Sequence, residues 1–597
     1  MEQKYRPLTV EEIHILQSNG NYAEDWSQVM ICEPFYCNNI RNNYFVGSLF
    51  LGPFENKLVF DEGLALPEGI TNSRIVSSTI GAHCVIHNVH YLSNFKIGDN
   101  SLLFNVDEMT SSSNKLQYIE PMNECGGRKI CPFNGMLIAD AYLWAKYRDH
   151  SILMQRLDDF TKESLNSNEG CIGTVGSHCV IKNCRTIHNV TINSSEQCPS
   201  RLVDCVVVSD GIVGYGCHLE YGCIALRFLL GENVKLEKGV RLNDTVVGDN
   251  STIACCEVGN NIIFPAHEQH HNNSFLIASL IKGQSNVAAG ATIGSNHNGR
   301  TSDNELVAGR GFWPGLCSSF KHSSRFASYC LLAKADYPNE LDIKLPFALV
   351  NNNVSKDCLE VMPAYWWMYN MYALNRNSHK FAARDKRVYK CQHIEFSPFA
   401  PDIVEEIIDG CKLLSNWIEC ANGGEVIATG LEKSKRKTII LKPVAAINAY
   451  QEMLIYYAMQ VLTNQGENLS LPNRKLTIRE TRWINLGGQL LCGSDFDQLI
   501  SDIEQGRLNS WQEIHNRYNQ LWKQYPEIKQ QHAYDILCEI FHKSIIDDND
   551  WKSFCNQYSE ICKKVSLEIK KTRDKDNNNL FRQMTYDNLD EMNAVLN

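Results

Sequence analysis

Residues 230–265 read LGENVK LEKGVR LNDTV VGDNST IACCE VGNNII FP, and their regular spacing indicates the fold. Each unit begins with an aliphatic or aromatic residue, and successive units are five or six residues long. Such a rhythm is the signature of a parallel β-helix, in which each short strand places one apolar side chain in the core and three strands complete a triangular coil. We therefore expect inward-facing side chains at positions 230, 236, 242, 247, 253, 258 and 264.

A tetrad of an apolar residue, glycine, an acidic residue and asparagine recurs at one phase of these units. It occupies residues 97–100, 230–233 and 247–250, with a variant at 258–261. Glycine and asparagine adopt positive φ angles at little cost. The tetrads are therefore predicted to form corners of the coil.

A longer repeat shows that the coil is interrupted. IGAHCVIHNV at 80–89 and VGSHCVIKNC at 175–184 share six of ten residues, which puts His83 and His178 at one phase and predicts corner positions for both. Between them lies an insertion at about 107–170 with a helical pattern, MLIADAYLWAKYRDHSILMQRLDDF, at 136–160. We expect this insertion to lie on the outside of the solenoid.

The two ends of the chain carry helical signals. Thr9 and Glu12 form a capping box, so residues 1–39 are predicted to be a helical cap on one open end of the solenoid. Residues 40–355 are predicted to form the parallel β-helix with its insertion, and residues 356–597 a mostly α-helical C-terminal domain. Within the latter, RDKRV at 384–388 is interpreted as a solvated basic face and residues 570–579 as an exposed loop. The expected fold class is mainly β.

The composition narrows the functional classes. Among 597 residues, 68 are acidic and 57 basic, and the resulting charge of -11 disfavours nucleic acid as a partner. The N-terminus has no apolar signal core, and no apolar run is long enough for a bilayer span, so we expect a soluble, cytoplasmic protein with no membrane partner. The 24 cysteines are expected to be thiols that fill the core.

Across roughly residues 40–110 and 170–350, the rhythm resembles the left-handed β-helix family of acyltransferases and related sugar-nucleotide enzymes. The left-handed sense is implied by this resemblance alone. Locally, NVAAGATIGSNHNGRTSDNELVAG at 286–309 looks like the part of the glucosamine-1-phosphate acetyltransferase domain that contacts sugar phosphate and acetyl-coenzyme A. The whole chain also looks like a family of large bacterial hexapeptide-repeat proteins of unknown function, a likeness that implies no chemistry.

The resemblance implies site residues in two places. That family has a catalytic histidine somewhat more than twenty residues upstream of the loop, and AHEQHHNNSF at 266–275 supplies His271, which fits the spacing best, and His270 as the alternative. In the loop itself, the resemblance implies substrate contacts by Asn296, His297, Asn298 and Arg300. His297 and Asn298 replace the family's aromatic and acidic residues, and Phe275 lacks the hydroxyl of the family's tyrosine, so the identity of the substrate does not carry over.

Acyl transfer from a thioester needs a base, and a neutral imidazole suits that task near neutral pH. Coenzyme A also carries phosphates and an adenine ring, for which the candidates are Arg310, Trp313, Lys321 and Arg325. The alternative is that these cations are solvated corner residues. His267, Glu268, His270 and His271 are metal-ligand types, but they lack the spacing of a zinc site, so no metal is expected.

These observations favour an acyltransferase that moves an acyl group from acetyl-coenzyme A, or a related thioester, to a sugar, sugar phosphate or sugar nucleotide. The alternative is a non-catalytic protein that binds a sugar nucleotide or acts as a scaffold on the solenoid. Relatives in the resembled family are usually trimers, so the resemblance implies a homotrimer, although the insertion and the helical domain could block that packing.

Overall fold

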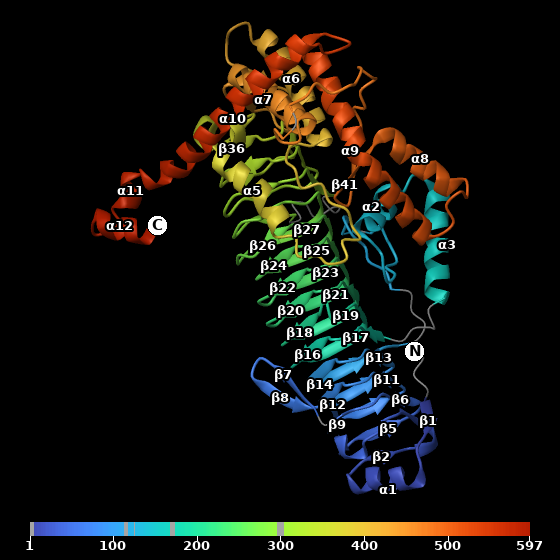
Figure 1. Ribbon diagram of the computed structural model, residues 1–597. Helices are drawn as coiled ribbons and strands as arrows, with labels where there is room; N and C mark the ends of the chain where they lie inside the picture. Colours follow the sequence, from blue (N-terminus) through green and yellow to red (C-terminus); the bar gives the residue numbers. More distant parts are fainter. Residues whose placement is uncertain are drawn as a thin grey trace.

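The computed structural model describes residues 5–55, 57–112, 117–124, 126–167, 173–294, 304–467 and 469–596. Its dominant element is a parallel β-solenoid of about 17 turns, drawn from blue to yellow-green in Figure 1. A helical insertion lies along one side, and a largely helical C-terminal region covers the far end (Figure 1). The predicted fold class is confirmed.

Each coil consists of one short strand and one longer strand that bends in the middle. The short strands stack as face A: β18 (Arg201–Val203), β20 (His218–Glu220), β22 (Lys235–Glu237), β24 (Thr252–Ala254) and β26 (Glu268–Gln269). The first halves of the longer strands form face B and their second halves face C: β19 (Val207–Val213), β21 (Ile224–Leu230), β23 (Arg241–Val247), β25 (Glu257–Ile263) and β27 (Phe275–Ile281). A residue with a left-handed φ marks each bend, for example Asp244 at 46° and Asn260 at 53°.

The six-residue rhythm places its apolar side chains inside the coil at all but one predicted position. Positions 230, 236, 242, 247, 253 and 258 are buried in the main core. The prediction for position 264 is wrong: Ile263 continues the inner row of Val247, and Phe264 faces outward, with its ring against Tyr142 of the insertion. Adjacent residues of a strand point to opposite sides, so only one of two consecutive apolar residues can enter the core.

The tetrads at 97–100, 230–233 and 247–250 form corners, as predicted. Their asparagines adopt the left-handed conformation, with φ angles of 57°, 58° and 56°. Their glycines meet a different requirement, because a Cβ atom on Gly98 would lie 2.6 Å from the backbone nitrogen of Ser177 in the next coil. The variant at 258–261 is wrong as a member of this set: Asn260 forms the bend between faces B and C, and Asn261 points into the core.

The insertion packs on face C. Helix α2 (Ile138–Lys146) covers an outward row of aliphatic side chains, one from each coil, and α3 (Ser151–Ser167) belongs to the same apolar cluster. The row consists of Ile212, Leu229, Val246, Ile262 and Leu280, which are paired in register along the sheet. Helix α8 (Gly493–Glu504) and the first part of α9 (Trp511–Phe541) complete this second core. The insertion therefore lies outside the coil.

The N-terminal end carries the predicted capping box on α1 (Val10–Ser18). Glu12 N donates to Thr9 Oγ1 at 3.2 Å, and Thr9 N donates to Glu12 Oε2 at 2.7 Å. Strands of the solenoid already begin beside this helix, at β2 (Tyr22–Ala23) and β3 (Val29–Cys32).

The opposite end is closed by a change of strand direction. β36 (Leu349–Asn353) pairs antiparallel with β37 (Cys358–Met362). β39 (Lys437–Ile440) then pairs parallel with β37 and extends this sheet. Over this end pack α6 (Pro401–Ala421), α7 (Pro443–Leu462), α9 and α10 (Asp548–Asn577). The predicted loop over 570–579 is wrong up to Asn577, since residues 570–577 continue α10. Lysine, arginine and aspartate are compatible with a solvated helix, so their charge did not decide between helix and loop.

A connection from the capped end runs back along the solenoid. Helices α4 (Tyr365–Tyr369) and α5 (Met371–Ala383) begin it, and α5 lies beside face A (Figure 1). Residues 384–398, here called the strap, then follow the corner between faces C and A before α6 begins. The strap brings a distant part of the chain onto the tetrad corners.

Candidate functional site

The three histidines of 266–275 have different environments. His267 lies inside the coil, fully buried, where its imidazole contacts Ser285 Oγ at 2.8 Å and Gln269 Oε1 at 3.2 Å. His270 and His271 are exposed at the corner between β26 and β27, with ring centroids 4.5 Å apart. Only His270 and His271 of this group can meet a ligand from solvent.

The burial of His267 has a consequence for stability. Burial lowers the pKa of its imidazole to about 4, from an unfolded value near 6.5. The folded state favours the neutral ring. The contribution of this ring to the free energy of unfolding is therefore complete above pH 6.5 and is lost as the pH falls from 6.5 to 4. We expect a loss of roughly 3 kcal/mol over that window.

His267→Gln tests this expectation in urea unfolding between pH 7.5 and 4. The variant lacks the imidazole, so its stability deficit relative to the wild type is expected to shrink as the pH falls. A deficit that stays constant across the window contradicts the assignment.

Helix α5 brings cations to the exposed histidine pair. Lys380 and Arg384 both form ion pairs with Glu268, and the Arg384 Nη1 to Glu268 Oε1 distance is 2.8 Å. Desolvation lowers the pKa of His270, and Lys380 and Arg384 act in the same direction while Glu268 opposes them. This environment favours a neutral imidazole beside a net positive surface.

The predicted substrate contacts Asn296, His297, Asn298 and Arg300 lie outside the residues that the structure describes. The predicted coenzyme A contacts lie within them and point to different places. Arg310 is 2% exposed and forms a bidentate ion pair with Asp402 of α6, at 2.7 and 3.1 Å.

The remaining three predicted contacts are also separated. Trp313 packs on Trp366 with ring centroids 5.4 Å apart. Lys321 pairs with Glu340 at 3.0 Å, and Arg325, on the continuation of face C, pairs with Asp342 at 2.9 Å. The structure therefore does not gather the four predicted residues at one surface, and each cation has a carboxylate partner.

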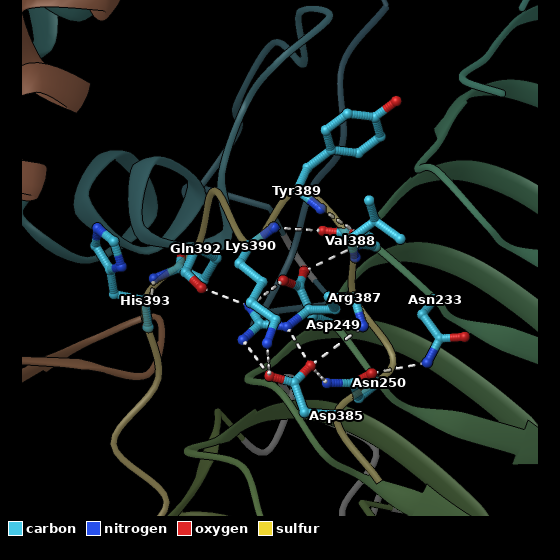
Figure 2. Close-up of polar contacts among 12 residues, drawn as sticks. Asn233, Asp249, Asn250, Asp385, Arg387, Val388, Tyr389, Lys390, Gln392 and His393 are labelled. Carbon is cyan, nitrogen blue, oxygen red and sulfur yellow. Dashed lines mark hydrogen bonds and ion pairs between the residues drawn. The ribbon is translucent and has the colours of Figure 1, made fainter. Parts of the chain in front are cut away.

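A polar cluster that the sequence did not reveal joins the strap to the tetrad corners (Figure 2). The buried carboxylate of Glu232 accepts hydrogen bonds from three consecutive backbone amides, those of Val388, Tyr389 and Lys390. The last two distances are 2.9 Å. The acidic position of the tetrad at 230–233 thus binds the strap.

Arg387 makes the second attachment of the strap. Its guanidinium is buried between Asp249, at 2.9 Å, and Asp385, also at 2.9 Å. The interpretation of residues 384–388 as a solvated basic face is therefore wrong for Arg387. The stacked corner asparagines continue the cluster, since Asn233 donates to Asn250 at 2.7 Å and Asn250 donates to Asp385 at 2.9 Å.

The two aspartates respond differently to Arg387. Burial raises the pKa of Asp249, and the nearby Arg387 offsets only part of this effect. Burial acts in the same sense on Asp385, but hydrogen bonds from Arg387 and Asn250 outweigh it and lower its pKa to about 2. Asp249 is therefore the carboxylate whose burial is incompletely compensated.

A cavity of about 260 Å³ lies between the strap, the solenoid and the insertion. Its wall combines aliphatic side chains, corner backbone, amides, two tyrosines, a thiol and two carboxylates. The lining residues are Asn134, Gly135, Met136, Leu137, Ile138, Asn193, Ile212, Gly214, Tyr215, Leu229, Leu230, Gly231, Glu232, Asp249, Tyr389, Cys391 and Gln392.

Two kinds of site are not found in the described part of the chain. Over these residues, no helix combines the length and apolar character required to cross a bilayer. The same residues contain no group of three histidine, cysteine, aspartate or glutamate side chains arranged to hold a metal ion.

Fold and repeats define the class as a β-solenoid protein built from hexapeptide repeats. The chain belongs to the family described as a domain of unknown function (DUF4954), whose model matches residues 5–418. A second domain of unknown function (DUF6819) matches residues 468–577. A relative from Treponema pallidum (strain Nichols), described as an uncharacterized protein, is 42% identical over 652 residues, which cover 99% of this chain and 90% of that protein.

Two solved structures are similar to parts of the chain. UDP-N-acetylglucosamine O-acyltransferase (LpxA) from Moraxella catarrhalis RH4 aligns with a TM-score of 0.12 and 10% identity, over 41% of this chain and 86% of that one. A putative acetyltransferase from Desulfovibrio desulfuricans G20 aligns with a TM-score of 0.11 and 9% identity, over 57% of this chain and 74% of that one.

Proposed function

We propose that the protein is an acyltransferase that moves an acyl group from a coenzyme A-type thioester to a sugar, sugar phosphate or sugar nucleotide. His271 is the general base, and His270 is the alternative. The observation that carries this proposal is the exposed imidazole pair at one coil corner, beside the cations of α5.

The chemistry needs few groups. A neutral imidazole takes the proton of the acceptor hydroxyl or amine as that atom attacks the thioester carbonyl carbon. The new carbon–oxygen or carbon–nitrogen bond forms, the carbon–sulfur bond breaks, and the proton passes to the departing sulfur. His271 is exposed and so can reach an acceptor that approaches from solvent.

The phosphates of coenzyme A fit the cationic surface of α5 better than they fit the predicted contacts Arg310, Lys321 and Arg325. Arg376, Lys380 and Arg384 lie on or directly after this helix, and Glu268 balances only one of their charges. The Arg384 side chain is 60% exposed, whereas Arg310 is buried and held by Asp402. Lysine and arginine near a neutral imidazole therefore supply the phosphate contacts in this proposal.

Calorimetric titration with coenzyme A tests the donor site without knowledge of the acceptor. Lys380→Ala/Arg384→Ala is expected to weaken binding by about a hundredfold or more, since each of the two charge-assisted contacts contributes roughly 1.5–3 kcal/mol. Lys321→Ala/Arg325→Ala removes the same charge from other surfaces and is expected to leave the affinity unchanged. The reverse order of effects, or no binding by the wild type, contradicts the donor site on α5.

A second candidate function is a non-catalytic binding or scaffolding role on the solenoid. The cavity under the strap favours it, because that cavity lies at a different corner from the histidine pair. Binding of coenzyme A without any turnover would favour this role over acyl transfer.

A further inference from the structure

The cavity under the strap is assembled from three distant parts of the chain. Residues 134–138 of the insertion form one wall, the coils from Asn193 to Asp249 form the second, and Tyr389, Cys391 and Gln392 of the strap form the third. The strap is held over it by the amide contacts to Glu232 and by Arg387. A volume of about 260 Å³ is close to the lower limit of ordinary ligand pockets, roughly 300 Å³, and so suits a small molecule.

The charged groups of the lining have one sign. Among the described residues of the lining, Glu232 and Asp249 carry the charges, and none is a lysine, arginine or histidine. An anionic ligand would meet two carboxylates without a cation in the wall. The thiol of Cys391 experiences the same field: burial, Glu232 and Asp249 raise its pKa, and Arg387, which lies outside the lining, opposes them only in part.

Asp249 retains the capacity to accept further hydrogen bonds. Asp249 accepts one from Glu232 N through Oδ1 at 3.1 Å and one from Arg387 through Oδ2 at 2.9 Å. An ionised carboxylate has about four acceptor positions, so a ligand with N–H donors adds to these contacts without displacing them.

Aromatic and aliphatic groups complete the lining. The rings of Tyr215 and Tyr389 have centroids 4.5 Å apart at an angle of 50°, and the Tyr389 hydroxyl lies 2.8 Å from Ser195 Oγ. Tyrosine faces attract organic cations. Leu137, Ile138 and Ile212 provide the apolar surface that an alkyl group requires.

From this combination of two carboxylates, two tyrosine rings and an aliphatic wall, we infer that the cavity under the strap binds a small organic cation, an ammonium group on a short alkyl chain. The ammonium lies toward Asp249 and the tyrosines, and the alkyl chain lies along the insertion. This site is independent of the proposed acyl transfer, since it lies at the corner between faces C and A rather than at the histidine corner.

Calorimetry with probes of equal size and different charge tests the inference. Butylammonium is expected to bind the wild-type protein, and butan-1-ol and butyrate are expected to bind about tenfold or more weakly at matched ionic strength. Equal affinity for butylammonium and butan-1-ol, tighter binding of butyrate, or no binding of butylammonium overturns the inference.

Two variants locate the binding. Tyr389→Ala removes an exposed ring while the backbone amide that holds Glu232 remains, and it is expected to weaken butylammonium binding by about tenfold. Tyr91→Ala removes an exposed tyrosine elsewhere on the solenoid and is expected to have no effect. If Tyr389→Ala binds butylammonium as tightly as the wild type does, the cation does not bind in this cavity, and the inference is overturned.

Discussion

Arg387→Ala is expected to release the strap and to destabilise its docking by about 3–5 kcal/mol. Arg387 and Asp249 are only 3% and 5% exposed as side chains, and the ion pair between them spans 2.9 Å. The substitution leaves a buried carboxylate without its cation, which is the costly way to break such a pair. It also removes the contact to Asp385, which holds the start of the strap.

Hydrogen exchange over residues 384–398 measures this effect locally. Arg325→Ala is the matched control, because Arg325 also makes a two-contact ion pair with an aspartate but is 65% exposed. The control is expected to cost less than about 1 kcal/mol. If the strap of Arg387→Ala exchanges as slowly as that of the control, Arg387 does not hold it.

The second large effect concerns turnover. His271→Ala is expected to lower the acyl-transfer rate by about a hundred- to ten-thousandfold, the usual contribution of a positioned general base. Binding of coenzyme A is expected to persist, since α5 supplies the phosphate contacts. Chromatography of acyl-coenzyme A consumed in the presence of an acceptor mixture measures the rate.

His178→Asn is the control for this variant. His178 is also at a coil corner, with φ of 58°, and asparagine tolerates that conformation. This control is expected to retain full activity. Unchanged turnover in His271→Ala rejects His271 as the base, and loss of turnover in His270→Ala alone transfers the role to His270.

The solenoid could be predicted from the sequence because each coil is formed by a short segment of the chain with the same pattern of apolar residues. The apolar residue of each unit contacts its equivalents in the coils before and after, so a short-range rhythm is sufficient to indicate it. The predicted inward position of Phe264 was wrong because two apolar residues are adjacent there. Which of them enters the core depends on the insertion that covers Phe264. The predicted corner at 258–261 was wrong because the sequence does not distinguish an asparagine inside the coil, such as Asn261, from an asparagine at a corner.

The polar cluster that holds the strap could not be predicted from the sequence, for a different reason. Glu232 meets amides more than 150 residues away, and no repeat or motif connects the two segments. Arg387 lies in a run of charges that is typical of a solvated surface, yet one side chain of that run is buried. Arg310 is also buried, and its ion pair with Asp402 joins the solenoid to the helical domain.

The most direct test of acyl transfer is mass spectrometry of an acceptor mixture after incubation with the wild-type protein. The mixture holds sugars, sugar phosphates and nucleotide sugars, and the donors are acetyl-coenzyme A and a long-chain acyl-coenzyme A. We predict that one acceptor class gains the acyl group with the wild type and not with His271→Ala. A wild-type protein that leaves every acceptor unmodified and does not bind coenzyme A would contradict the proposed function.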